Sequence, residues 1–170
     1  MNISTLAQVA ANYQNSVEVH TDILSQFLAA ANGDAVLKAH RDFVEANQHG
    51  FGDREFHWMW KLVVDAMPPS WTFLEIGVYK GQVLSLVQLL SQQQGKRCQA
   101  FGITPLDNSG DAVSNYELKS GEDYYSLIRQ IHERFGIDSW ATTKLLRGFS
   151  NDDAVIRMAR SNAYYDAIYI

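Results

Sequence analysis

The sequence predicts an α/β fold in which a helical segment precedes a parallel sheet. Apolar positions recur at helical spacing through residues 1–69, and short apolar runs alternate with helical patterns through residues 70–170. Parallel strands are buried on both faces and therefore read as continuous apolar runs. Strands separated by helices indicate right-handed βαβ units. We therefore expect an N-terminal helical segment or lid over 1–69 and a sheet domain over 70–170.

The composition is that of an ordinary globular protein, with 46% hydrophobic and 19% charged residues among 170. The net charge of −5 argues against a nucleic-acid surface. Met1–Ser4 lacks the basic flank of a signal peptide, and the apolar runs are too short to span a bilayer. We therefore expect a cytoplasmic protein without nucleic-acid or membrane partners. The single Cys98 excludes an internal disulfide and a cysteine-based zinc cluster.

Four helical patterns fill residues 1–69. Their boundaries are marked by Asn32-Gly33, Asp34, Gly50-Phe51-Gly52, Asp53 and Pro68-Pro69. Asp34 and Asp53 are expected to cap the third and fourth helices. The segment either packs as a layer on the sheet or forms a lid or dimerisation element over the ligand site. The lid hypothesis draws on residues around the glycine loop, namely His49, Phe51, His57, Trp58 and Trp60. The five histidines show no metal-ligand spacing.

Residues 70–170 alternate strand and helix. The strands are expected over 71–76, 97–103, 142–146 and 165–170, and the helices over 82–93, 122–135 and from a cap at Ser150 or Asn151 to Arg160. The expected Rossmann-like order of the strands is 3-2-1-4, with a switch point between the first and the fourth. Ligands bind at such a point, outside the carboxyl ends of the strands. Asp166 stands at the start of the fourth strand and is therefore expected at the opposite, amino edge.

The turn after the first strand reads Glu75-Ile76-Gly77-Val78-Tyr79-Lys80-Gly81. Gly77 permits a tight turn and the close approach of a ligand, and Gly81 lets the helix begin near the strand. The free N–H groups at that helix start favour an anionic group. The spacing Gly-x-x-x-Gly fits a dinucleotide pyrophosphate poorly, and a P-loop would need Gly-Lys-Ser/Thr. A purely structural βα turn is the alternative.

Residues 73–82, Phe-Leu-Glu-Ile-Gly-Val-Tyr-Lys-Gly-Gln, resemble motif I of the class I S-adenosylmethionine-dependent methyltransferases. Residues 100–104, 145–150 and 165–170 resemble that family's second, third and fourth strands, in family order. The resemblance covers residues 70–170 and is closest to small-molecule methyltransferases whose fourth strand continues into Asp-Gly-x-His. It implies an enzyme that transfers a methyl group from S-adenosylmethionine to a small hydroxylated acceptor, such as a sugar or secondary metabolite.

The resemblance also implies which residues bind the cofactor. They are Glu75, Gly77, Tyr79, Gly81, Thr104, Asp107, Phe149 and Ser150. The family usually has an acidic residue at the end of strand two for the ribose hydroxyls, whereas this chain has Thr104. Because a hydroxyl cannot accept two hydrogen bonds with a full charge, Asp107 is either the substitute or an ordinary loop carboxylate. Phe149 and Ser150 lie near the adenine, or they are a core residue and a helix cap.

In the resembled subgroup, an acid and a histidine after strand four supply a general base or bind a divalent metal. Here they would lie beyond Ile170, as would three further strands, so we expect a truncated chain whose catalytic residues are unknown. Within the chain no metal site is expected. The acidic residues flanking the long loop are interpreted as a solvated surface, namely Asp111, Glu117, Glu122 and Asp123. Alternatively, the chain is a natural short form that completes its sheet with another subunit, and an exposed last strand predicts a homodimer or aggregation.

Two other functions compete with methyl transfer. The first is a non-catalytic Rossmann-like module that binds a nucleoside ligand or only a partner, which Thr104 and the early end of the chain suggest. The second is a nucleotide-dependent oxidoreductase, which the glycine spacing disfavours.

Overall fold

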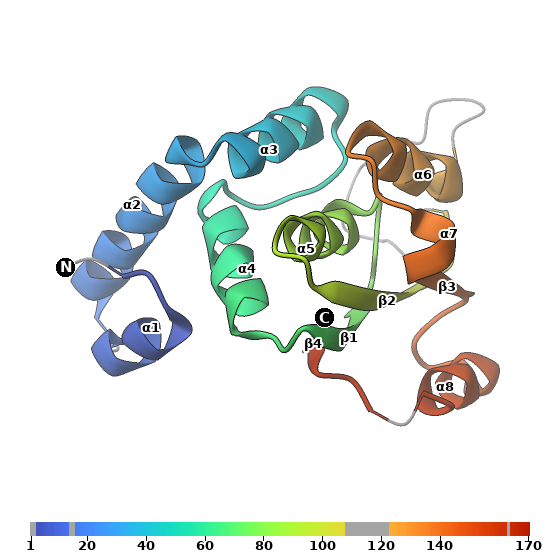
Figure 1. The fold of residues 1–170 in the computed structure, drawn as a ribbon. Coiled ribbons are helices and arrows are strands. Elements are labelled where there is room, and N and C mark those ends of the chain that lie inside the picture. Colours follow the sequence, from blue (N-terminus) through green and yellow to red (C-terminus); the bar gives the residue numbers. More distant parts are fainter. Residues whose placement is uncertain (1–2, 14–15, 108–122, 163) are drawn as a thin grey trace. The chain divides into compact units, whose positions relative to one another are not determined.

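The computed structural model describes residues 3–13, 16–107, 123–162 and 164–170 (Figure 1). The chain divides into two compact units, the helical unit Met1–Pro68 and the sheet unit Pro69–Ile170. Among the described residues, no helix has the length and apolar character needed to cross a membrane.

The helical unit contains four helices. They are α1 (Leu6–Asn12), α2 (Val17–Gly33), α3 (Ala35–Asn47) and α4 (Glu55–Ala66). The predicted cap at Asp34 is confirmed, because its carboxylate accepts hydrogen bonds from the N–H groups of Val36 and Leu37 at 2.9 and 3.1 Å. Helix α3 ends before the glycine loop, at a left-handed Gln48 with φ 54°. The predicted cap of the fourth helix is wrong by one residue, since Arg54 rather than Asp53 precedes α4.

Packing in the helical unit combines an apolar cluster with buried polar contacts. The apolar cluster contains Ile3, Ile23, Phe27 and Leu62. Nδ1 of His40 on α3 lies 2.9 Å from Nε2 of His57 on α4, and both rings are buried. Arg41 donates to the carbonyl oxygens of Phe51 and Gly52, which fixes the loop between these helices. The two helices are therefore joined by directional contacts as well as by apolar packing.

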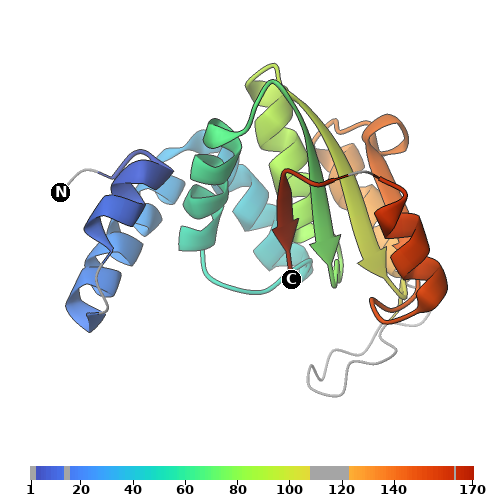
Figure 2. The same cartoon turned by 90° about the horizontal axis from the view of Figure 1, so that it is seen from below.

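The sheet unit is Rossmann-like, as the sequence predicts. Its elements are β1 (Ser70–Ile76), α5 (Gln82–Gln93), β2 (Arg97–Thr104), α6 (Tyr124–Arg134), α7 (Ser139–Thr142), β3 (Thr143–Arg147), α8 (Asp153–Arg160) and β4 (Ala167–Tyr169). The strands are parallel and follow the order β3-β2-β1-β4, which confirms the predicted 3-2-1-4 topology (Figure 2). The short helix α7 was not expected, and β4 is shorter than the predicted 165–170.

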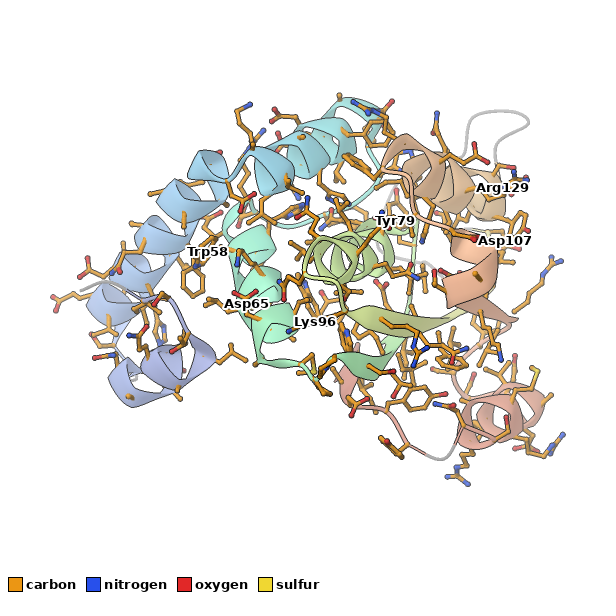
Figure 3. The ribbon with its side chains drawn as sticks, in the orientation of Figure 1. Trp58, Asp65, Tyr79, Lys96, Asp107 and Arg129 are labelled. Atoms are coloured by element: carbon orange, nitrogen blue, oxygen red, sulfur yellow. The ribbon has the colours of Figure 1, made fainter. Side chains whose placement is uncertain are left out.

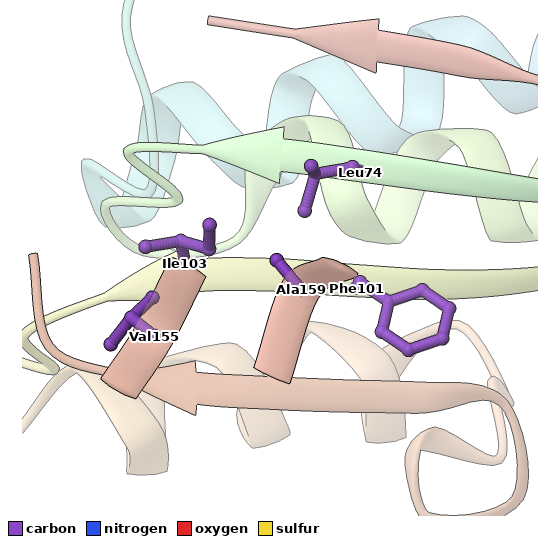
Figure 4. Packing of buried hydrophobic residues seen from close by; sticks show 5 residues of the cluster. All are labelled: Leu74, Phe101, Ile103, Val155 and Ala159. Atoms are coloured by element: carbon purple, nitrogen blue, oxygen red, sulfur yellow. The ribbon is translucent and has the colours of Figure 1, made fainter. Parts of the chain in front are cut away.

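Helices α5 and α8 cover opposite faces of this sheet (Figure 2). On the α8 face, Leu74, Phe101 and Ile103 pack with Val155 and Ala159 of the helix (Figure 4). Because side chains alternate along a strand, the neighbours of Leu74 point to the α5 face. This alternation places Glu75 under α5.

A buried polar network joins α5, α6 and β3. Oε1 of Gln88 lies 2.8 Å from Nε2 of His132 and accepts a hydrogen bond from the hydroxyl of Thr143 at 3.0 Å. Nδ1 of His132 lies 2.6 Å from the carbonyl oxygen of Ile128. Burial lowers the pKa of His132, against a hydrogen bond to the Ile128 backbone that raises it. The histidine therefore has a structural role.

The amino edge of the sheet holds Asp166, as its place before β4 predicts. Its Oδ2 accepts hydrogen bonds from the N–H and the hydroxyl of Thr72 at 2.7 and 3.0 Å. Beyond it, β4 pairs with β1 from Phe73↔Ala167 to Glu75↔Tyr169. Asp166 thus fixes the start of β4, at the edge opposite to the candidate site.

Candidate functional site

The turn between β1 and α5 contains three residues with left-handed backbones, Gly77 (φ 87°), Tyr79 (φ 50°) and Gly81 (φ 88°). The Gly77 N–H donates to the Ile103 carbonyl at 3.0 Å, which extends the pairing of β1 with β2. A Cβ at Gly77 would meet no atom of the described residues within 4 Å, whereas a Cβ at Gly81 would lie 3.0 Å from Cγ1 of Ile128 on α6. Gly77 therefore borders open space, and Gly81 permits close packing of α6.

Tyr79 makes the turn aromatic. Its ring packs edge-on against Tyr124 at the start of α6, with the ring centroids 5.1 Å apart, and Nζ of Lys80 lies 5.2 Å from the Tyr79 centroid. Tyr79 and Lys96, both labelled in Figure 3, come just before and just after α5 in the chain. The Tyr79–Tyr124 contact could not be predicted from the sequence, because the two residues are distant in the chain.

Glu75 lies at the end of β1 with only 3% of its surface exposed. Burial raises the pKa of Glu75 well above its usual range, although a hydrogen bond from the Leu84 backbone lowers it. Leu84 is the third residue of α5, so the carboxyl group lies at the first turn of that helix. Oε2 of Glu75 is buried and has no hydrogen-bond partner among the described residues. A buried polar atom without a partner at a helix N-terminus fits a site that binds a polar ligand.

The end of β2 is shaped by Thr104. Its buried Oγ1 accepts a hydrogen bond from the N–H of Leu106 at 3.0 Å, and Leu106 has a left-handed backbone with φ 66°. The half-buried Asp107 follows this bend and is labelled in Figure 3. The Thr104 oxygen already accepts one hydrogen bond, and its hydroxyl hydrogen can still be donated to a ligand.

The end of β3 adjoins the end of β2, since the Gly148 N–H donates to the Thr104 carbonyl at 3.0 Å. Phe149 is 43% exposed, so it is not the core residue of the alternative interpretation. Ser150 is also exposed and does not cap α8. The N-cap residue is Asp152, so the predicted cap at Ser150 or Asn151 is wrong. The Asp152 side chain makes no hydrogen bond to the helix; its Oδ2 accepts one from the Phe149 N–H at 2.8 Å, in the turn before α8.

Hollows occur at both edges of the sheet. Two of about 370 and 490 Å³ flank Arg97 and Cys98 at the amino edge, the first also lined by Asp166. A hollow of about 320 Å³ on the α8 face is lined mainly by apolar residues and reaches Ser150. The size of a hollow therefore does not identify the candidate site. We identify it instead by the Glu75 oxygen without a partner among the described residues and by the open space at Gly77.

Four acidic residues flank the long loop after β2, and the structure describes one of them. Asp111, Glu117 and Glu122 lie outside the described residues. Asp123 caps α6 by accepting a hydrogen bond from the Ser126 N–H at 2.7 Å, which lowers its pKa. Within the described ranges, no group of three or more His, Cys, Asp or Glu side chains is placed to hold a metal ion.

No protein-family model matches the chain, and a search of curated proteins finds no match. The residues singled out from the sequence come from the carboxyl ends of β1, β2 and β3. Direct backbone hydrogen bonds join these ends, from Gly77 to Ile103 and from Gly148 to Thr104. Glu75, the turn 77–81, Thr104 and the segment 148–150 therefore form one candidate ligand site at the switch-point edge.

Proposed function

We propose that this protein is an S-adenosylmethionine-dependent methyltransferase that methylates a small hydroxylated molecule, and that residues 69–170 hold the cofactor. The observation that carries the proposal is the open space at Gly77, two residues from the partnerless carboxyl oxygen of Glu75. The parallel order β3-β2-β1-β4 supports it, because ligands of such sheets bind at this edge. The resemblance of residues 73–82 to motif I gives the ligand its chemical identity.

The site residues fit the parts of this cofactor. The carboxyl group of Glu75 suits the ammonium group of the methionine moiety, and the N-terminus of α5 suits its carboxylate. Asp107 and the Thr104 hydroxyl suit the ribose, and the exposed ring of Phe149 suits the adenine. Bound S-adenosylmethionine would supply an electrophilic methyl carbon. An acceptor hydroxyl oxygen would attack that carbon in line, S-adenosylhomocysteine would leave as the S–C bond breaks, and the hydroxyl proton would pass to a base or to solvent. The chain contributes mainly by holding the reactants in that geometry.

A second candidate function is a module that binds a nucleoside ligand without catalysis. The observation that favours it lies at the end of β2, where the residue is Thr104 rather than a carboxylate and its Oγ1 already accepts a hydrogen bond from the Leu106 N–H. Ribose binding then depends on Asp107 beyond the bend. Such a module would bind S-adenosylmethionine or S-adenosylhomocysteine but methylate no acceptor.

Isothermal titration with S-adenosylmethionine, S-adenosylhomocysteine and NAD separates these functions. We expect both sulfur compounds to bind and NAD not to bind, because the turn lacks the glycine spacing that a pyrophosphate needs. Failure of both sulfur compounds to bind contradicts the proposal. Binding without methyl transfer to any of a panel of hydroxylated acceptors favours the non-catalytic module.

A further inference from the structure

The α8 face of the sheet changes character along its two central strands. Toward the carboxyl edge this face is apolar and packs against α8. Toward the amino edge it carries polar residues, namely Ser70 and Thr72 on β1 and Arg97 and Gln99 on β2. These side chains share the face of Leu74 because side chains alternate along a strand. Central parallel strands usually carry apolar residues on both faces, so core packing does not explain this polar half.

The polar half of the face borders the hollow of about 370 Å³ at the amino edge. Two residues of opposite charge, Arg97 and Asp166, both line this hollow, together with the hydroxyl-bearing Ser70, Thr72 and Thr142. Neither charged residue takes part in an ion pair within the described ranges. The hollow therefore presents one positive and one negative group that do not neutralise each other.

Hydroxyl groups of β1 hold both charged side chains in place. Oγ of Ser70 accepts hydrogen bonds from Nε and Nη2 of Arg97, both at 3.3 Å. Oδ2 of Asp166 accepts hydrogen bonds from the N–H and the hydroxyl of Thr72 at 2.7 and 3.0 Å. Because Ser70 and Thr72 are two residues apart on one strand, these anchoring points lie about 7 Å apart. Nη1 of Arg97 and Oδ1 of Asp166 have no partner among the residues that the structure describes.

We propose that this hollow is a second ligand site, which binds a free amino acid with an aromatic side chain. The outer nitrogens of Arg97 donate to the carboxylate, and Oδ1 of Asp166 accepts from the ammonium group. A zwitterion neutralises both charged residues at once, whereas a simple anion or cation leaves one of them unpaired. Tyr164 also lines the hollow and is 70% exposed, so its ring is available to an aromatic side chain.

This site lies at the edge of the sheet opposite to the Gly77 turn, so the inference does not depend on the proposed function. The test is an NMR titration of the ¹⁵N-labelled protein with L-phenylalanine and two matched probes. One probe, 3-phenylpropanoate, lacks the ammonium group, and the other, 2-phenylethylamine, lacks the carboxylate. We expect L-phenylalanine to shift the amide signals of Thr72, Gln99 and Asp166 and to leave that of Gly77 unchanged.

Each matched probe should bind about tenfold more weakly than L-phenylalanine, because it loses one set of charge-assisted hydrogen bonds. Three results overturn the inference: no binding of L-phenylalanine, equal binding of the three compounds, or shifts confined to the carboxyl edge.

The variant Arg97→Gln supplies an independent measurement. Arg97 is exposed, and glutamine can still donate to Oγ of Ser70, so the fold is expected to hold. L-phenylalanine should bind this variant about tenfold more weakly, while 2-phenylethylamine, which has no carboxylate, should bind as to the original protein. Lys96→Gln is the matched control, since Lys96 lines only the neighbouring hollow of about 490 Å³, and it should leave binding unchanged. Equal weakening in both variants would trace the effect to net charge and overturns the inference.

Discussion

Gly77→Val is expected to abolish the binding of S-adenosylmethionine while the sheet unit stays folded. Within the part of the chain that the structure describes, a Cβ at this position meets no atom within 4 Å, so the added side chain would project into the space assigned to the ligand. Because Gly77 has φ 87°, valine also strains the backbone, which we expect to lower the free energy of unfolding by about 1–3 kcal/mol. Titration should show binding weakened by at least about 100-fold, or about 2.7 kcal/mol.

Gly95→Val is the matched control for this change. Gly95 also has a positive φ, 65°, and also borders open space, but it lies in the turn after α5, at the amino edge. We expect a comparable loss of stability and unchanged binding. Loss of binding in both variants would show that backbone strain, rather than the position of Gly77, causes the effect.

Acid is expected to destabilise the protein through His57. Burial, with smaller contributions from Arg41 and Arg54, lowers the pKa of His57 from 6.5 to about 3. Above pH 6.5 the ring is neutral in both states, whereas below it the unfolded chain binds a proton that the folded protein does not. The stability that depends on neutral His57 is therefore lost as the pH falls from 6.5 toward 3. Between pH 7.5 and 5 this amounts to about 2 kcal/mol.

Urea unfolding of the original protein and of His57→Gln, over pH 7.5 to 5, measures this contribution. Glutamine can keep a hydrogen bond to His40 but does not titrate. The unfolding free energy of the variant should therefore fall less steeply with decreasing pH than that of the original protein. The difference in slope should correspond to about one bound proton. His132, whose pKa is also lowered, contributes equally to both proteins and cancels in the difference. Identical slopes would contradict the assignment of this pH dependence to His57.

The two central strands could be predicted from the sequence because β1 and β2 are largely buried. Phe73 and Ala100 stand in their apolar runs, and the helical patterns between the strands favour parallel pairing. The outer strands β3 and β4 are half-buried or exposed, so their order follows from the alternation of strands and helices. The ends of the elements were less predictable. Helix α8 begins after Asp152 although the preceding Ser150 and Asn151 are also residues that commonly cap helices, so the sequence offers three neighbouring starting points.

The candidate site was predictable where it depends on local chain order and not where it depends on distant contacts. Glu75, Gly77 and Gly81 follow β1 directly, so the topology alone places them at the switch point. The packing of Tyr124 and Ile128 against the turn joins segments more than forty residues apart. The raised pKa of Glu75 likewise depends on burial, which no local pattern reports.

The most direct test of the account is to map the binding of S-adenosylmethionine onto the backbone amides by ¹⁵N–¹H NMR. The account predicts the largest chemical-shift changes at Gly77, Tyr79, Gly81 and Gly148, at the carboxyl edge of the sheet. The amide signals of Gly95 and Gly136, which line the hollow at the amino edge, should not change their chemical shifts. Shifts concentrated at the amino edge, with the turn 77–81 unaffected, would contradict it.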